Sequence, residues 1–117
     1  MLRVCVPTWG NDGLDDVVCE HFGRAPTFTI VDMDNGDVVV IPNRGEHMGG
    51  RGHPPEFLIR EGVDVVICQG LGVKAIQTLK RFGVDVYLGA SGSVKDSIEM
   101  WRRGLLKLAT DMDGCRR

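Results

Sequence analysis

The sequence predicts a single α/β domain, built as a mixed sheet with helices on both faces. From residue 63 onward, short β-branched runs alternate with segments whose apolar residues recur at helical spacing. This alternation is typical of parallel strands joined by helical crossovers. Earlier in the chain, Asn35-Gly36 stands between two further apolar runs and predicts an antiparallel hairpin. The length of 117 residues suits one compact domain.

The first half of the chain supplies one isolated strand and the hairpin. The apolar run 2–7 predicts the isolated strand, and the polar, glycine-containing segment 8–20 follows as a loop that is long for a compact domain. The hairpin strands are expected over 27–33, where apolar and polar residues alternate, and over 38–41, which is β-branched. A second loop, rich in glycine and histidine, runs over 43–53.

The next elements alternate between helix and strand. Pro54-Pro55 suits the first turn of a helix, and Gly62 suits the left-handed residue beyond its end. The run 63–68 predicts a buried strand. A helix is expected over 73–82, where the following residues share one face: Val73, Ile76, Leu79 and Phe82.

The chain should end with a strand, a helix and a tail. The run 84–88 predicts the strand, and Ser93 with Asp96 forms a capping-box pattern at the start of the last helix. The polar segment 107–117 carries few apolar anchors, so we expect a flexible C-terminal tail beyond a domain of residues 1–106.

Composition excludes several classes of protein. No apolar run approaches the ~20 residues that a membrane span needs, and the first residues lack the pattern of a secretory signal, which predicts a cytoplasmic protein without membrane partners. The formal charge of −2 argues against nucleic-acid binding. The cysteines show no CxxC spacing, which argues against a disulfide framework or a zinc knuckle. They stand at positions 5, 19, 68 and 115.

Metal-type ligands and a cation gather just before the hairpin. Cys19 and His21 are donors suited to iron, copper, zinc or metal-sulfur clusters. Arg24 offers fixed donors to an anionic group, while Gly23 and Pro26 constrain the backbone between them. Each of these residues taken alone could equally serve packing or capping, so the segment is informative mainly as a unit.

Four motifs in this order resemble the dinitrogenase iron-molybdenum cofactor biosynthesis family, a NifX-like and NafY-core-like group of small proteins. The resemblance covers nearly the whole chain. The motifs are Glu20-His21-Phe22-Gly23-Arg24-Ala25-Pro26, the glycine-histidine loop Gly49 to His53, Gln69-Gly70-Leu71-Gly72, and Gly89-Ala90-Ser91-Gly92-Ser93-Val94.

The resemblance implies a ribonuclease H-like three-layer fold, with a five-stranded mixed sheet of order 3-2-1-4-5 in which strand 2 is antiparallel. It implies non-catalytic binding, storage or delivery of an iron-, molybdenum- or other metal-sulfur cluster, in cofactor biosynthesis or metal-cluster homeostasis. The expected partners are cluster donor and acceptor proteins, and the expected state is a monomer or weak homodimer.

A bound cluster would need ligands from more than one loop. His21 ranks first and Cys19 second, although Cys19 stands where the family resemblance leads us to expect a serine or another small polar residue. His47, His53 and Cys68 are the candidate contributors from neighbouring loops. The two histidines could equally be solvated loop residues. Cys68 stands at a strand end and could face the site or be buried, and burial is the favoured expectation.

An anionic cluster also needs positive charge and close approach of the backbone. The charge can come from Arg24, Arg44, Arg51 and Lys74, with Arg24 and Arg51 selected as site residues. Glycines at the strand ends let amides reach a ligand without side-chain obstruction. Many such glycines serve only tight turns. The candidate backbone contacts are Gly49, Gly50, Gly52, Gly70, Gly72, Ser91 and Gly92.

A nucleotide or other small-anion site is the main alternative. The stretch 70–75 fits the GxGxxA pattern of a dinucleotide site between a strand and a helix. The acid that should follow the next strand is missing, because Leu88-Gly89-Ala90 stands there.

A hydrolase of ribonuclease H-like fold is the weakest alternative. Two-metal chemistry needs carboxylates on the central strands, yet the first strand has none. The acids at positions 12, 15, 16 and 20 fall in a loop and are expected to be solvated.

Overall fold

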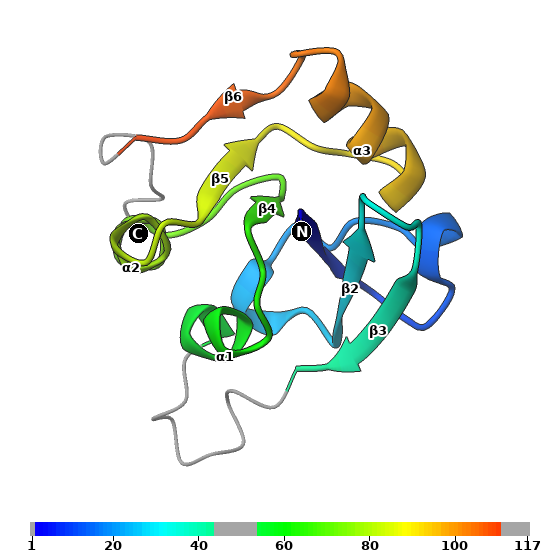
Figure 1. Ribbon diagram of the computed structural model, residues 1–117, viewed down its shortest axis with the longest axis horizontal. Helices are drawn as coiled ribbons and strands as arrows, with labels where there is room; N and C mark the ends of the chain where they lie inside the picture. Colours follow the sequence, from blue (N-terminus) through cyan, green and yellow to red (C-terminus); the bar gives the residue numbers. More distant parts are fainter. Residues whose placement is uncertain (1, 44–53, 111–117) are drawn as a thin grey trace.

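The computed structural model describes residues 2–43 and 54–110. Six strands in this part of the chain form one sheet in the order β3-β2-β1-β4-β5-β6 (Figure 1). The strands are β1 (Arg3–Thr8), β2 (Thr27–Asp32), β3 (Val38–Pro42), β4 (Val65–Ile67), β5 (Asp85–Leu88) and β6 (Lys107–Leu108).

The sheet is mixed, as the sequence predicts. β1 pairs with β4 and β4 pairs with β5 in parallel, whereas β1–β2, β2–β3 and β5–β6 are antiparallel. The predicted hairpin is confirmed as β2 and β3. Gly36 in its turn has φ +83°, a conformation that glycine adopts without the steric cost of a side chain.

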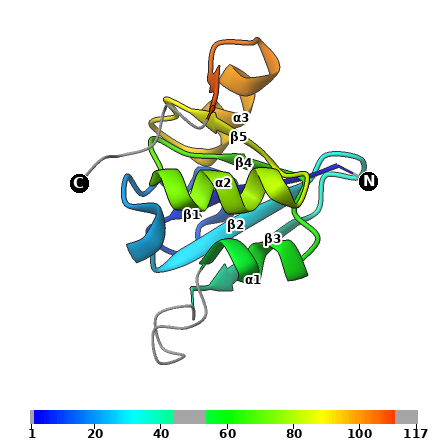
Figure 2. The ribbon, with the colours of Figure 1, turned by 90° about the vertical axis from the view of Figure 1, so that its left-hand side faces the viewer.

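Helices cover both faces of the sheet, as Figures 1 and 2 show. They are α1 (Pro54–Arg60) and α2 (Val73–Arg81) on one face and α3 (Val94–Arg102) on the other. No helix in the described residues is both long and apolar enough to cross a membrane. The positions of Gly62 and Gly83 beyond α1 and α2, each with positive φ, confirm the predicted helix ends.

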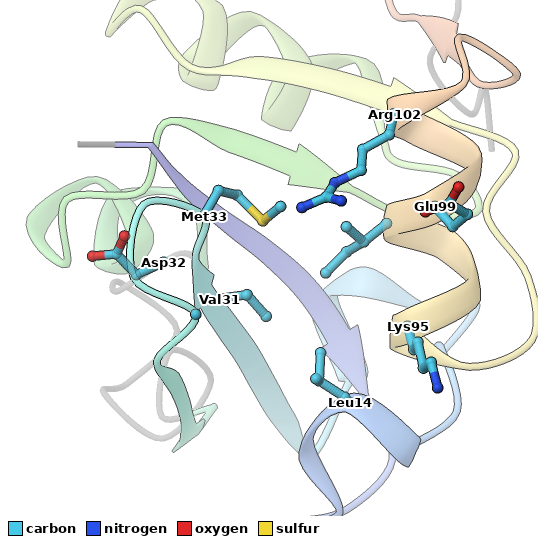
Figure 3. A pocket seen from close by; sticks show the side chains of 9 residues that line it. Leu14, Val31, Asp32, Met33, Lys95, Glu99 and Arg102 are labelled. Carbon is cyan, nitrogen blue, oxygen red and sulfur yellow. The ribbon is translucent and has the colours of Figure 1, made fainter.

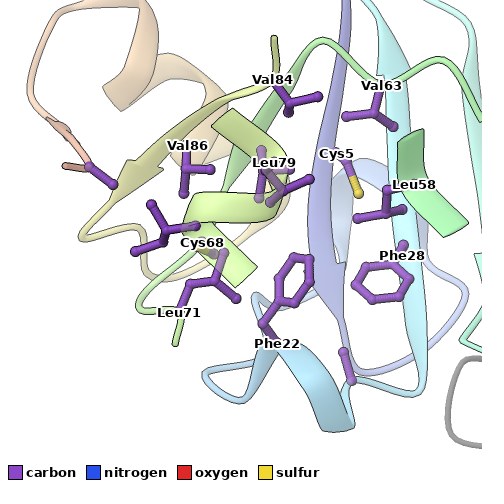
Figure 4. Close-up of a cluster of buried hydrophobic side chains, with 14 of the residues drawn as sticks. Cys5, Phe22, Phe28, Leu58, Val63, Cys68, Leu71, Leu79, Val84 and Val86 are labelled. Atoms are coloured by element: carbon purple, nitrogen blue, oxygen red, sulfur yellow. The ribbon is translucent and has the colours of Figure 1, made fainter. Parts of the chain in front are cut away.

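Each sheet face has its own hydrophobic core, because side chains of one strand alternate between the two faces. Cys5 and Phe28 of the sheet pack beneath α1 and α2 in the first core (Figure 4). Val4 and Ile67 pack beneath α3 in the second. The chain therefore forms three layers, with the sheet in the middle.

The expectation of five strands is wrong, because the sheet has a sixth strand, β6. β6 lies in the segment expected to be a tail. Two apolar residues flank it and hold it to the domain: Leu106 is 8% exposed and Ala109 is 1% exposed. The Ala109 amide also donates to the Val86 carbonyl at 2.7 Å. Two isolated apolar residues in a polar sequence did not indicate such a strand. Residues 111–117 lie outside the described part of the chain.

The long connection between β1 and β2 is folded around a carboxylate. It contains two short 3-10 helices, η1 (Gly13–Asp15) and η2 (Phe22–Arg24). Asp16 was expected to be solvated, but it is only 5% exposed. Its carboxylate accepts hydrogen bonds from the amides of Gly10 at 2.9 Å, Asp12 at 3.2 Å and Val17 at 2.7 Å. The three amides need acceptors in the folded turn, and these hydrogen bonds stabilise the buried carboxylate.

The same connection is fixed to the start of α3. The Val18 amide donates to the Gly92 carbonyl at 2.9 Å, and the Val94 amide donates to the Asp16 carbonyl at 2.9 Å. The Ser93 hydroxyl oxygen accepts from the Asp96 amide at 3.0 Å, which confirms the predicted N-cap. These bonds hold the connection after β1 in a defined position at the carboxyl ends of the parallel strands.

Candidate ligand-binding groove

Two segments that are far apart in the sequence line one groove of about 560 Å³. One segment is the last part of the connection between β1 and β2, which includes η2. The other segment is the turn between β4 and α2. Both follow parallel strands, and the carboxyl ends of such strands are where α/β folds bind ligands. The lining residues are Glu20, His21, Phe22, Gly23, Arg24, Gln69, Gly70, Leu71 and Gly72.

The η2 wall is anchored by an aromatic contact. Phe22 is 4% exposed, and its ring centroid lies 5.1 Å from that of Phe28 in a tilted arrangement (Figure 4). The Arg24 amide donates to the His21 carbonyl at 3.0 Å and closes the turn. Burial of Phe22 therefore leaves the neighbouring His21 and Arg24 exposed at the groove.

Cys19 lies under this wall rather than in it. Its side chain is buried, it does not line the groove, and its thiol donates to the His21 carbonyl oxygen at 3.6 Å. Burial raises the pKa of Cys19, and the nearby Glu20 carboxylate adds to this, while hydrogen bonding from the His21 backbone to the sulfur, which favours the thiolate, opposes it. The thiol of Cys19 is therefore protonated and packed in the core at neutral pH in this conformation, whereas metal coordination would require the thiolate.

The second wall is tied to the neighbouring strand end. The Gly89 amide donates to the Gln69 carbonyl at 3.2 Å, and the Ala90 amide donates to the Cys68 carbonyl at 3.1 Å. Leu71 is 5% exposed and joins the core beneath α2. These bonds connect the third sequence motif to the fourth and fix the turn that faces η2.

α2 begins at the groove without a side-chain cap. Its N-cap is Gly72, which lines the groove and offers no side-chain acceptor to the first amides of the helix. Gly72 has φ −65° and no atom within 4 Å of where a Cβ would stand, so neither its conformation nor crowding requires glycine. The start of α2 favours anions through its amides and dipole.

The groove combines one guanidinium, one imidazole and one carboxylate. Among the described residues, no hydrogen bond or ion pair engages the side chain of Arg24. No group of three or more His, Cys, Asp and Glu side chains in residues 2–43 and 54–110 is placed to hold a metal ion. This part of the chain can therefore offer a ligand one imidazole nitrogen, a cation and backbone amides, but not a full set of metal ligands.

Three predicted site residues have structural roles in this conformation. Cys68 is fully buried in the same core as Cys5. Burial raises the pKa of Cys5 well above its ordinary value, and electrostatic repulsion from Cys68 raises it further. The Ser91 carbonyl accepts from the Ser97 hydroxyl at 3.1 Å, and the Gly92 carbonyl is the acceptor that fixes the loop after β1. None of the three lines the groove.

The remaining candidates belong to the glycine-histidine loop and lie outside the described residues. They are His47, Gly49, Gly50, Arg51, Gly52 and His53. Sequence reasoning did not assign Glu20 and Gln69 to the site, although both line the groove. Glu20 and Gln69 could have been predicted from their positions in two of the four motifs.

A second, smaller pocket of about 250 Å³ lies on the α3 face (Figure 3). It has an apolar floor, with Leu14, Val31 and Met33 among its residues, and Lys95 and Arg102 of α3 stand at its sides. It contains none of the residues that the sequence analysis selected. The groove at η2 is therefore the site that sequence and geometry share.

Solved structures share this architecture. The apo form of the orange protein from Desulfovibrio gigas superposes with a TM-score of 0.84 at 25% identity, covering 99% of this chain and 98% of that one. A protein from Thermotoga, described as a putative NifB protein, gives a TM-score of 0.74 at 31% identity, covering 92% and 93%. A putative dinitrogenase from Methanocaldococcus jannaschii gives 0.68 at 16% identity, over 93% and 95%, which supports the fold alone.

Sequence comparison gives the family. An uncharacterized protein of Methanocaldococcus jannaschii is 35% identical over 112 residues, which cover 92% of this chain and 91% of that protein. The family model described as dinitrogenase iron-molybdenum cofactor matches residues 2–104. The match spans both walls of the groove and the three α-helices of the described residues. The chain therefore belongs to the dinitrogenase iron-molybdenum cofactor family.

Proposed function

We propose that this protein binds, stores or delivers a metal-sulfur cluster of iron-sulfur or iron-molybdenum type, without catalysing its conversion. The cluster is cargo, received from a donor protein and passed to an acceptor protein in cofactor biosynthesis or metal-cluster homeostasis. Family membership supports an association with the iron-molybdenum cofactor. The groove between η2 and the β4–α2 turn is the proposed binding site.

One observation carries the proposal: His21 and Arg24 face the same groove as the uncapped start of α2. A metal-sulfur cluster presents metal atoms that accept an imidazole nitrogen and sulfur atoms that carry negative charge. Arg24 and the helix amides complement that charge. His21 is the metal ligand in this arrangement.

The incomplete ligand set fits a carrier. A resident cluster is usually held by several thiolates, whereas the described residues of the groove offer a single imidazole. His47 and His53, from the loop 43–53, are proposed as further ligands. Cargo held by imidazoles and electrostatic contacts, without thiolates, can be released to an acceptor more readily than a cluster held by several thiolates.

We propose a ribonuclease H-like fold, because the order of the first five strands agrees with the order that the family resemblance implies.

A hydrolytic role nevertheless has less support. Two-metal hydrolysis requires clustered carboxylates, but the described residues contain no such group, and both oxygens of Asp16 accept backbone hydrogen bonds.

Binding of a nucleotide or another small anion is the second candidate. The uncapped start of α2 and Arg24 would suit a phosphate as well as a cluster. This reading gives His21 no necessary role, because a phosphate needs no metal ligand. The requirement for His21 therefore separates the two candidates.

The test is anaerobic reconstitution with iron, sulfide and molybdate, followed by metal analysis and visible absorption spectroscopy. The wild-type protein should retain metal and sulfide after desalting, and ATP or inorganic phosphate at equal concentration should not displace them. Absence of bound metal together with tight nucleotide binding would contradict the proposal.

Two variants test the residue roles. His21→Ala should lose most of the bound metal, and Arg24→Ala should weaken retention because the sulfur charge is no longer compensated. Lys95→Ala is the matched control, since it removes an exposed cation on the opposite face of the sheet. Full metal occupancy in His21→Ala would remove that residue assignment while leaving the cargo proposal intact.

A further inference from the structure

The two edges of the sheet differ in how they are protected. Exposed edge strands invite pairing with another chain, and proteins usually shorten them, charge them or interrupt them with bulges. β6 has only two residues and carries Lys107. β3 has five residues without a charged side chain, and its register with β2 runs unbroken from Val38 to Pro42.

Two hydrogen bonds identify which backbone groups of β3 face outward. The Asp32 amide donates to the Asp37 carbonyl at 2.8 Å at one end of the hairpin, and the Asn43 amide donates to the Pro26 carbonyl at 3.0 Å at the other. In an antiparallel pair, hydrogen-bonded and non-hydrogen-bonded positions alternate. The odd-numbered residues of β3 therefore bond to β2, and the even-numbered residues present their backbone groups to the other side.

The outward backbone groups are thus those of Val38, Val40 and Pro42. Val38 and Val40 each present an N–H and a C=O, whereas proline presents only its carbonyl. Within residues 2–43 and 54–110, the structure gives none of these groups a partner beyond β2. The side chains beside them are apolar and accessible: Val38 is 37% exposed and Val39 is 45% exposed.

We propose that β3 pairs with β3 of a second copy of this chain, so that one sheet continues through a homodimer. The strands run antiparallel about a two-fold axis at Val39. Val38 of each copy then exchanges both hydrogen bonds with Val40 of the other copy. Every outward N–H group gains an acceptor.

A second copy is favoured because the edge is complementary to itself. Directly opposite residues share one face of a sheet, so Val38 meets Val40 on one face and Val39 meets its own counterpart on the other. Asp37 comes opposite Ile41 of the other copy, which keeps the two acidic turns apart. The low formal charge of −2 adds little repulsion between copies.

Pairing along one five-residue strand buries less than the roughly 1,200 Å² at the lower limit of stable interfaces. The dimer should therefore be in exchange with monomer and depend on concentration. Sedimentation equilibrium of the full chain should show the mass rising with concentration from 12.8 kDa toward twice that value. Hydrogen exchange of the Val38 and Val40 amides should slow over the same range.

Val39→Lys tests the interface without removing a backbone group, since it places two cations at the two-fold axis. This variant should stay monomeric at concentrations where wild type dimerises, and its circular dichroism and melting temperature should remain near those of wild-type monomer. Val39→Thr should still dimerise, because it keeps the β-branched shape without charge. Leu108→Lys is the control for the opposite edge and should also dimerise.

A wild-type mass that stays at one chain over all concentrations would overturn the proposal. So would a dimer that Val39→Lys leaves intact, or one in which the Val38 and Val40 amides exchange as fast as in monomer. Pairing of β3 with an extended peptide from another protein, without any self-association, would also count against the second copy as occupant.

Discussion

The thiol of Cys19 donates a hydrogen bond to the His21 carbonyl oxygen at 3.6 Å, beneath the wall that presents His21 to the groove. The sequence places these two residues two positions apart as possible metal ligands. The structure separates them, because only His21 lines the groove. Cys19 supports the backbone of the proposed ligand His21 from the core side.

Cys19→Ser should therefore retain the metal content of wild type after reconstitution, measured by metal analysis of the desalted protein. The serine hydroxyl can still donate to the His21 carbonyl, and burying it should cost about 1–3 kcal/mol at most in unfolding free energy. His21→Ala, reconstituted in parallel, gives the loss expected when a true ligand is removed. A comparable loss in Cys19→Ser would show that the thiol coordinates the cluster.

Asp16→Asn tests the carboxylate at the centre of the loop. Its two oxygens accept from three amides, whereas an amide side chain has only one oxygen and leaves at least one donor unsatisfied. We expect a loss of about 1–3 kcal/mol in the free energy of unfolding, measured with urea. Asp15→Asn is the matched control: Asp15 is exposed, and its substitution should change stability little.

The sequence predicted the three α-helices and five of the six strands of the described residues, because their apolar residues repeat with clear periods. It did not predict the two short 3-10 helices η1 and η2. Asp16 and β6 escaped prediction for the same physical reason. The burial of Asp16 depends on amides that the folded turn brings together, and β6 depends on Ala109 reaching β5 after the last helix. Both are tertiary effects without a local period.

The groove was predictable in part. Parallel strands place their carboxyl ends at one sheet edge, which brought together two of the four sequence motifs. Candidate residues outside those two motifs were harder to assign. Cys68 ends a buried run and points into the core, while Ser91 and Gly92 contribute carbonyls to internal hydrogen bonds.

Ala109→Asp tests whether residues after 106 belong to the folded domain. Ala109 is 1% exposed beside β5, so a carboxylate there must lose its hydration on burial or must release β6 from the sheet. The free energy of unfolding should fall by about 2 kcal/mol or more. Leu108→Asp adds the same charge at a residue that is 48% exposed and should cost much less. Equal stability of the two variants would argue for a dispensable tail.

The buried thiol of Cys5 should make stability fall at alkaline pH. Burial raises the pKa of Cys5 well above the ordinary value of 9.0, so the folded protein keeps a proton that the unfolded chain releases. This contribution is fully present below pH 9 and is lost as pH rises toward the folded pKa. Its limiting slope is about 1.4 kcal/mol per pH unit.

Urea unfolding of wild type and Cys5→Ala at a series of pH values above neutrality separates the contribution of the Cys5 thiol from that of other groups that titrate in the same range. Cys5→Ala should be less stable at neutral pH because it leaves a small cavity, yet its stability should decline less steeply above pH 9. The difference between the two curves should therefore shrink as pH rises. Parallel curves would mean that the Cys5 thiol ionises equally readily in the folded and unfolded chain, contrary to its complete burial.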